Sequence, residues 1–346
     1  MKKLLLSLAV IVGVCSAASA TTWRINSNPK AKAHFLTLKD AMSSLDVKSG
    51  DVLMLDPGAH EGTTITKQVT IVGTGYLLAD NKDWKETSSA SITGNLSLNS
   101  HGCRVIGVSV SIVDVYGDNC VVDRCYGSVD LNEAANASIT NCYLTRVYNS
   151  NKAAPTNYVV SNCIIAGRIH IEYIASSSGT IKNCVIYDNC KSEYLVNVEN
   201  AEFYNNIVIN TNTEYKVENE ESVFYRNICT IDFDESLGNT FTNNVINIDP
   251  EYASPVYTDN KCVGNVALTD VFAWGEGLER RFMLSADSPA KGYATDGSDC
   301  GAFGGSTPYV LSGIPQFYPH ITEVSIPTKT SDNKLKVTLK IVNQNE

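Results

Sequence analysis

The chain has 346 residues, of which 43% are hydrophobic and 18% charged, a composition typical of a packed globular protein and not of a disordered one. It contains 27 Lys and Arg against 37 Asp and Glu, so its formal net charge is −10 at pH 7. An acidic chain does not attract phosphate backbones, which argues against non-specific nucleic-acid binding. No apolar run of about 18 residues occurs beyond the N-terminus, so we expect no internal transmembrane span.

Residues 1–20 have the three parts of a secretory signal peptide: two early lysines, an apolar stretch over 4–14 that is too short to span a bilayer, and a small-residue cleavage site ending at Ala20. We therefore expect a bacterial-type exported protein that is secreted, periplasmic or on the outer cell surface after cleavage near Ala20. Lipid attachment at Cys15 is the alternative, and the bulky Val14 before it disfavours this interpretation.

The capping segment comes next in the chain. Over residues 35–45 the apolar side chains fall on one helical face, and the sequence predicts an N-terminal helix that closes the core of the first coil. The face consists of Phe35, Leu38, Ala41, Met42 and Leu45. We expect the first coils to begin at Val69.

A repeat fills the middle of the chain: an apolar residue, any residue, Asn, and then Cys or Asn. Neighbouring Asn positions are 17, 21 or 22 residues apart. The intervening segments alternate β-branched and polar residues between Gly, Asn, Asp and Ser, and Leu is too sparse for a leucine-rich repeat. The sequence predicts an all-β fold, a parallel β-helix whose equivalent positions stack about 4.8 Å apart. The Asn position is occupied by Gly107, Arg124, Asn141, Asn162, Asn183, Asn205, Arg226, Asn243 and Gly264.

The residue after the Asn position forms a predicted inner ladder that changes from Cys to Asn along the chain. Stacked side chains point in parallel, which suits disulfide geometry poorly, so we expect buried free thiols; disulfides are the alternative that export suggests. The Asn members are expected to bond to one another or to turn backbone. The ladder comprises Cys125, Cys142, Cys163, Cys184, Asn206, Asn227, Asn244 and Asn265.

Residues 306–346 differ from the repeats. Leu335, Val337, Leu339 and Ile341 alternate with polar residues, which predicts a half-buried strand. Val324 and Ile326 lie where a hairpin partner would run. We therefore predict a signal peptide over 1–20, a β-helix domain over 21–305 and a hairpin-like extension over 306–346 that packs on the C-terminal end of the solenoid.

The chain resembles a known group in its opening segments, residues 50–58 and 65–73, in the Asn-Cys repeats, and in its exit segments, residues 284–292 and 299–305. It is similar to secreted right-handed parallel β-helix proteins of the pectate-lyase-like superfamily, over roughly residues 33–305. The resemblance implies a right-handed, single-stranded solenoid. It leaves the activity open, because this superfamily includes lyases, hydrolases, esterases, adhesins and inactive members.

The resemblance also implies where chemistry would lie. Lyases of this architecture use clustered Asp and Glu for Ca²⁺ with Arg or Lys as base, hydrolases use two or three Asp on neighbouring strands, and esterases use paired Asp with Arg. All place these residues outward on one strand face, across successive rungs.

We looked for such a face six, eight and ten residues past each Asn position. Ile169 and Ile171 must be buried, so the strand between 168 and 172 points Arg168, His170 and Glu172 outward. The next rung offers Lys191 and Glu193, and the earlier rungs offer Asp130 and Asn132, then Val147, Asn149 and Asn151.

These five residues, Arg168, His170, Glu172, Lys191 and Glu193, are the candidate catalytic set. The cationic side chains could neutralise a uronate, the imidazole could exchange a proton, and the two glutamates could act as acid and base. The alternative is an ordinary solvated face.

A second candidate is an acidic turn, where Asp232 and Asp234 could bind Ca²⁺ through oxygen ligands. Short acidic turns are also common without a metal. Ca²⁺ is the one cofactor that the sequence suggests.

From these features we expect an exported monomer that binds or processes an acidic polysaccharide, with lyase-type cleavage preferred and hydrolysis next. The alternative is a non-catalytic surface adhesin or structural rod.

Overall fold

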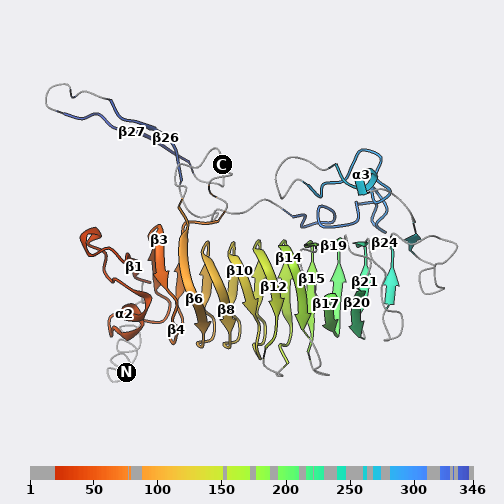
Figure 1. Cartoon of the computed structure of the whole chain (residues 1–346), viewed down its shortest axis with the longest axis horizontal. Helices are drawn as coiled ribbons and strands as arrows, with labels where there is room; N and C mark the ends of the chain where they lie inside the picture. Colours follow the sequence, from red (N-terminus) through yellow and green to blue (C-terminus); the bar gives the residue numbers. More distant parts are fainter. Residues whose placement is uncertain are drawn as a thin grey trace, which may run out of the picture.

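The computed structural model describes residues 20–76, 78, 88–150, 154–171, 177–187, 194–209, 216–220, 222–229, 240–246, 260–262, 268–273, 281–309, 320–327, 330 and 334–342. Two long parallel sheets run side by side along the long axis of the molecule (Figure 1). Through the middle coils, from β5 to β16, consecutive strands alternate between the two sheets, so each of these coils adds one rung to both. The fold is a right-handed parallel β-helix, as the sequence predicts.

The first sheet, sheet A, has eleven strands. Each is short and places an apolar residue inward. In chain order they are β1 Thr22–Ile25, β2 Val52–Leu55, β5 Thr70–Val72, β7 Arg104–Ile106, β9 Val121–Asp123, β11 Ser138–Thr140, β13 Tyr158–Ser161, β15 Gly179–Lys182, β18 Ala201–Tyr204, β21 Val223–Tyr225 and β23 Thr240–Thr242.

The second sheet, sheet B, has fourteen strands, and its longer members bend at a β-bulge into two stretches. Its strands are β3 Gly58–Glu61, β4 Thr64–Ile65, β6 Ala90–Leu98, β8 Ser109–Val115, β10 Tyr126–Asp130, β12 Tyr143–Tyr148, β14 Ile164–Ile171, β16 Val185–Tyr187, β17 Tyr194–Glu199, β19 Ile207–Ile209, β20 Lys216–Glu220, β22 Ile228–Cys229, β24 Val245–Ile246 and β25 Lys261–Cys262.

The recurring Asn lies at the corner between the sheets. Asn141 has a φ of 54° and Asn183 a φ of 52°, both in the left-handed region, and the other corners that the structure describes share this conformation. Asn and Gly tolerate it better than other residues, which explains the repeat. Arg124 and Arg226 adopt it as well, at φ 53° and 58°.

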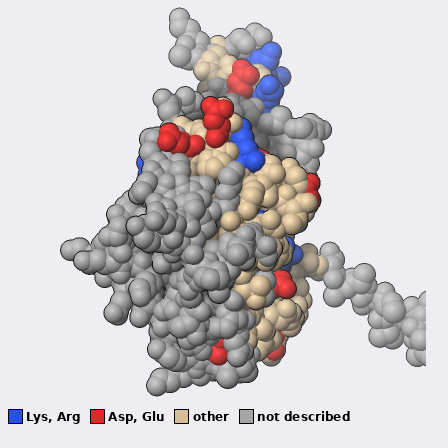
Figure 2. Space-filling model, turned by 90° about the vertical axis from the view of Figure 1, so that its right-hand side faces the viewer, with Lys and Arg blue, Asp and Glu red and all other residues tan. Residues whose placement is uncertain are grey.

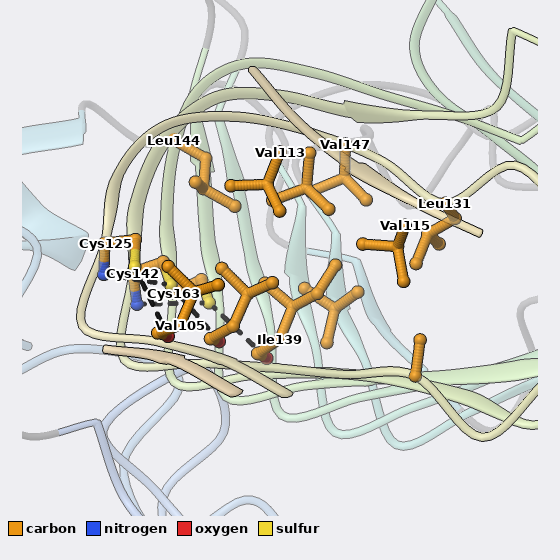
Figure 3. Close-up of a cluster of buried hydrophobic side chains, with 14 of the residues drawn as sticks. Val105, Val113, Val115, Cys125, Leu131, Ile139, Cys142, Leu144, Val147 and Cys163 are labelled. Carbon is orange, nitrogen blue, oxygen red and sulfur yellow. Dashed lines mark hydrogen bonds between the residues drawn. The ribbon is translucent and has the colours of Figure 1, made fainter. Parts of the chain in front are cut away.

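The inner ladder forms directly after each corner (Figure 3). The backbone N–H of Cys142 donates to Sγ of Cys163 at 3.4 Å, and all eight cysteines that the structure describes in full are buried and free. Further along, Nδ2 of Asn206 donates to Oδ1 of Asn227 at 3.1 Å. Stacking, free thiols and amide bonding are thus confirmed along this ladder.

The far end of the ladder differs from the prediction. Asn244 bonds to Asn260, with Nδ2 to Oδ1 at 2.8 Å, so Asn260 continues the ladder, and the predicted position Asn265 lies outside the described residues. Lys261 then pairs with Val245 in sheet B. The coil is shorter than the preceding ones, and a fixed repeat length therefore placed its corner too late.

The N-terminal end begins earlier than expected. β1 already pairs with β2 as the first rung of sheet A, so the coils do not start at Val69. Helix α2 spans Leu38–Ser43, shorter than 35–45, and a capping box between Thr37 and Asp40 opens it. Leu38 and Ala41 pack on the first core, but Leu45 lies beyond the helix end and is 86% exposed. A short 3₁₀ helix, η1, spans Pro29–Ala31.

The exit segment packs on the outside of the coils. Residues 281–309 and the short helix α3 (Leu268–Val271) pack against the outer face of sheet B. Ile164–Ile165 and Val185–Ile186 are buried on both faces, which is the pattern of a strand covered on both sides.

The corner asparagines fix this exit segment. Nδ2 of Asn183 donates to the carbonyl oxygens of Ala302 and Gly304 at 3.1 and 2.9 Å, and Nδ2 of Asn162 donates to Pro308 at 2.9 Å. The segment therefore runs back along the corners and closes a second apolar core.

The last two strands form the antiparallel hairpin that the alternation predicts, β26 His320–Ser325 with β27 Thr338–Val342. The expectation that it packs on the C-terminal end of the solenoid is wrong. Leu335 and Ile341 are 52% and 56% exposed, and the hairpin stands away from the coils in Figure 1.

Candidate functional site

One row of outward side chains crosses successive coils on the second stretch of sheet B. Strand pairing places its members directly beside one another from rung to rung. In each strand the flanking apolar residues point inward; Ile169 and Ile171, for example, are fully buried around His170. We call this the outward row, and it consists of Ser97, Asp114, Asp130, Tyr148, His170 and Asn197.

Asp114 and Asp130 are neighbouring carboxylates in this row. Asp114 is only 8% exposed, and its Oδ2 accepts hydrogen bonds from Nδ2 of Asn95 at 3.0 Å and from Oγ of Ser97 at 3.2 Å. Burial raises the pKa of Asp114 and the charge of Asp130 raises it further, although the two hydrogen bonds act in the opposite direction. The carboxyl group of Asp114 therefore keeps its proton to a higher pH than an ordinary aspartate does.

Asp130 is held by backbone donors. It is 3% exposed, and its Oδ1 accepts the N–H groups of Asn132 at 3.2 Å and Ser150 at 3.0 Å. Because β8 and β10 are adjacent parallel strands, Asp130 lies about 4.8 Å from Asp114 along the coil axis. The fold thus fixes two carboxyl groups side by side in a partly desolvated position.

Arg146 and Tyr148 lie on the next rung, two residues apart on one strand face. The guanidinium carbon of Arg146 is 4.1 Å from the ring centroid of Tyr148, and Nη2 lies 3.4 Å from the phenolic oxygen. Burial and then the charge of Asp130 raise the pKa of Tyr148, with Arg146 opposing them. Tyr148 is the direct neighbour of Asp130, and the cation that stacks on it lies opposite Ser128, two residues along the strand from the outward row.

The structure places Arg168 and His170 outward on β14, both partly exposed, where the sequence predicts them. Arg168 pairs across the rung with Arg146, and His170 pairs with Tyr148. Glu172, Lys191 and Glu193 lie outside the described residues, as do Asp232 and Asp234. The rung position expected for Lys191, beside His170, is taken by Asn197.

Counting six, eight and ten residues past each Asn position does not locate every member of the outward row. It gave Val147 and Asn132 as outward positions, yet Val147 points into the core and Asn132 is fully buried after the end of β10. The distance from corner to outward row varies between coils because a bulge or a longer turn intervenes.

The sequence carries a signal that does not depend on counting. Each row member is preceded by a buried apolar residue and most are followed by one, as in 113–115, 129–131, 169–171 and 196–198. Aligning these triplets would have found Asp114 and Tyr148.

Figure 2 shows the molecule from the end where the later coils lie. In this view the described Asp and Glu side chains lie singly or in small groups, with Lys and Arg beside some of them. The described atoms of this face form no large basic patch.

Two further properties concern only the described residues. None of their helices has the length and hydropathy of a membrane span. No group of three or more His, Cys, Asp or Glu among them is arranged to hold a metal ion.

No family model matches the chain, and no curated protein matches it. Solved structures to which it is similar are pectin methylesterases. The carrot protein is 9% identical with a TM-score of 0.39, over 75% of this chain and 92% of that one. The Aspergillus niger protein is 13% identical with a TM-score of 0.38, over 78% and 92%. The Erwinia chrysanthemi protein is 10% identical with a TM-score of 0.31, over 78% and 100%.

Proposed function

We propose that the protein hydrolyses an ester of an acidic polysaccharide at the Asp114/Asp130 pair. The observation that carries this proposal is the pairing of two outward carboxyl groups on adjacent rungs, one with a raised pKa, with Arg146 on the next rung opposite Ser128. Paired Asp with Arg is the pattern that the resemblance to pectate-lyase-like proteins implies for esterases.

The two carboxyl groups have different roles. Asp130, oriented by two backbone N–H donors, attacks the ester carbonyl carbon as a carboxylate and forms a mixed anhydride. Asp114 has the raised pKa of the pair and acts as the general acid: in its protonated form it gives its proton to the departing alkoxide, which leaves as the alcohol. Water then attacks the anhydride, Asp114 takes up the proton, and both groups return to their first state.

Lyase-type cleavage, the reaction preferred from the sequence, has less support in the described residues. It requires clustered carboxylates for Ca²⁺ together with a base, whereas Arg146 stacks on Tyr148. The raised pKa of Asp114 suits a proton donor better than a cation ligand.

The test compares the mature protein with the Asp114→Asn and Asp130→Asn variants on a methyl-esterified polyuronate, following methanol release. Either substitution should lower kcat by about 10²–10⁴-fold, the usual contribution of one proton-transfer or nucleophilic group. Asp287→Asn, at an exposed position in the exit segment, is the matched control and should keep full activity. The value of kcat/KM should fall on the alkaline side as Asp114 loses its proton.

Glycosidic hydrolysis is the second candidate, favoured by the spacing of the pair. The strands that carry the pair are about 4.8 Å apart, which is compatible with the short carboxyl separation of a retaining glycosidase. New reducing ends without methanol would favour it, and unsaturated uronates would favour a lyase instead. Full activity in Asp130→Asn would contradict the proposed site. Neither product nor glycan binding by the wild type would contradict the proposal and favour a structural rod.

A further inference from the structure

The first rung of the solenoid begins directly after the predicted cleavage site. Ala20 and Thr21 are exposed and precede strand β1, which pairs in parallel with β2 at the N-terminal end of the coils (Figure 1). The N–H of Val52 donates to the carbonyl oxygen of Thr21 at 2.9 Å, so the rung extends to Thr21 itself. β1 buries Ile25 completely and packs the partly buried Trp23 on the first apolar core. Contacts that fix Thr21 therefore stabilise the edge of that core.

Asp51, directly before β2, holds this end of the strand. It is 3% exposed, and its Oδ1 accepts the N–H of Thr21 at 2.8 Å. Its Oδ2 accepts Nε1–H of Trp23 at 2.8 Å and the N–H of Lys48 at 2.9 Å. Burial acts to raise the pKa of Asp51, but the hydrogen bonds and the charge of Lys48 outweigh it, so the pKa is lower than usual. The group is therefore a carboxylate at neutral pH.

The negative charge of Asp51 is held by neutral donors. None of the described Lys and Arg side chains lies within ion-pair distance of it. Nζ of Lys48 donates instead to the carbonyl oxygen of Leu45. A buried charge without an opposite charge costs free energy, which a cation at one of the donor positions would offset.

We infer that the chain is cut between Ala20 and Thr21, and that the new α-ammonium group of Thr21 forms an ion pair with Asp51 that fixes β1 as the first rung. Hydrolysis adds water across the peptide bond: Ala20 leaves with a carboxylate, and Thr21 gains an amino group that takes up a proton at neutral pH. Its nitrogen is already 2.8 Å from Oδ1, so the strand need not move. The ion pair lies at the start of sheet A and does not depend on the proposed ester hydrolysis.

The ion pair makes the stability of the first rung depend on pH. An α-amino group has an ordinary pKa of about 7.7–8.0, and a neighbouring carboxylate raises it. The stabilisation is then complete below the unfolded pKa and is lost as pH rises through the folded pKa. The other charged and titratable groups on the segments around β1 are Lys48, His34 against the Trp23 ring, the Arg24–Asp56 ion pair, and Lys67, which donates to the carbonyl oxygens of Ser44 and Val47.

The test begins with the full chain, exported from a bacterial host; its intact mass should correspond to residues 21–346. This protein is compared with residues 20–346, in which Ala20 moves the charge away but keeps the N–H of Thr21. Amide hydrogen exchange over β1 below pH 7 should be about tenfold slower in the 21–346 chain, and the difference should shrink as pH rises to about 9. Acylation of the α-amino group across the same range should show a pKa above the ordinary value.

Two variants assign the effect to the ion pair. Asp51→Asn should remove the difference in exchange and return the pKa of the α-amino group to its ordinary value. Asp46→Asn, exposed in the preceding loop, is the matched control and should leave both unchanged. The comparison of the two chain lengths alters no side chain, so it tests the ion pair even if Asp51→Asn weakens the fold.

Each other outcome overturns the inference. A mature chain that starts at Cys15, or at any residue other than Thr21, would reject the cleavage site. Equal exchange in the two chains, or an ordinary α-amino pKa in the 21–346 chain, would reject the ion pair. A difference that persists in Asp51→Asn would assign the effect to the added residue and not to the charge.

Discussion

The inner ladder and the outward row cross the same coils with the same spacing, but their neighbours interact in opposite ways. Within the ladder, Asn206, Asn227 and Asn244 each carry donor and acceptor, so identical neighbours bond to one another. Within and beside the row, Asp114 adjoins Asp130 and Arg146 adjoins Arg168, so identical charges repel. The bonded amides of the ladder stabilise the fold. The paired like charges do not stabilise it, so a functional reason for them is expected.

The largest effect is expected in the Asn part of the ladder. Asn227→Ala removes the acceptor for the N–H of Asn206 at 2.8 Å and the donor to the carbonyl of Phe203 at 2.8 Å, both buried. Leaving several buried polar groups without partners should cost about 3–5 kcal/mol of unfolding free energy, measured by denaturant titration. Asn99→Ala, at an exposed position, should change it by less than about 0.5 kcal/mol. A loss below 1 kcal/mol at Asn227 would show that the amides do not hold the coils together.

The Cys part of the ladder should respond less. Sγ of Cys163 accepts the N–H of Cys142 at 3.4 Å and donates to the carbonyl of Ser161 at 3.2 Å, and burial raises the pKa of this thiol so that it keeps its proton. Sulfur is a weak donor and acceptor, so Cys163→Ala should cost about 1–2 kcal/mol, mostly through the small cavity.

A reducing agent should leave the unfolding midpoint of the wild type unchanged, because the described thiols are free. If Cys163→Ala cost as much as Asn227→Ala, the two parts of the ladder would be equivalent and the chemical distinction between them would be lost.

The difference between the ladder and the row also explains which features of the structure the sequence alone predicts. The corner Asn recurs because the left-handed backbone admits few residues, so the fold follows from a local steric rule, as at Asn141. The outward row follows no such rule, because turns and bulges of variable length separate it from the corner. The sequence predicts His170 because the apolar residues Ile169 and Ile171 flank it. A fixed number of residues counted from the corner does not find Asp114, whereas its flanking apolar residues would.

The exit segment shows a different limit. Residues 281–309 cover apolar runs such as Val185–Ile186, and those runs are visible in the sequence. Which segment covers them is set by tertiary contacts with the corners, such as the bond from Nδ2 of Asn183 to Gly304, and no periodicity encodes that pairing. The position of the exposed hairpin relative to the coils could not be predicted for the same reason, because no periodicity encodes it.

The smallest effect is expected in the outward row, with the opposite sign. The folded state raises the pKa of Asp114 above its unfolded value, so the native protein binds more protons there, and its stability falls as pH rises through that interval. Asp114→Asn keeps the acceptor for Asn95 and Ser97 while removing the charge next to Asp130.

At pH 7 this variant should gain about 0.5 kcal/mol and lose that part of the pH dependence, as thermal unfolding between pH 4 and pH 7 would measure. Asp287→Asn should leave the pH dependence as it is. A loss of stability in Asp114→Asn at neutral pH would mean that the carboxylate pair stabilises the fold. The energetic difference between the inner ladder and the outward row would then be absent at the residues of the proposed chemistry.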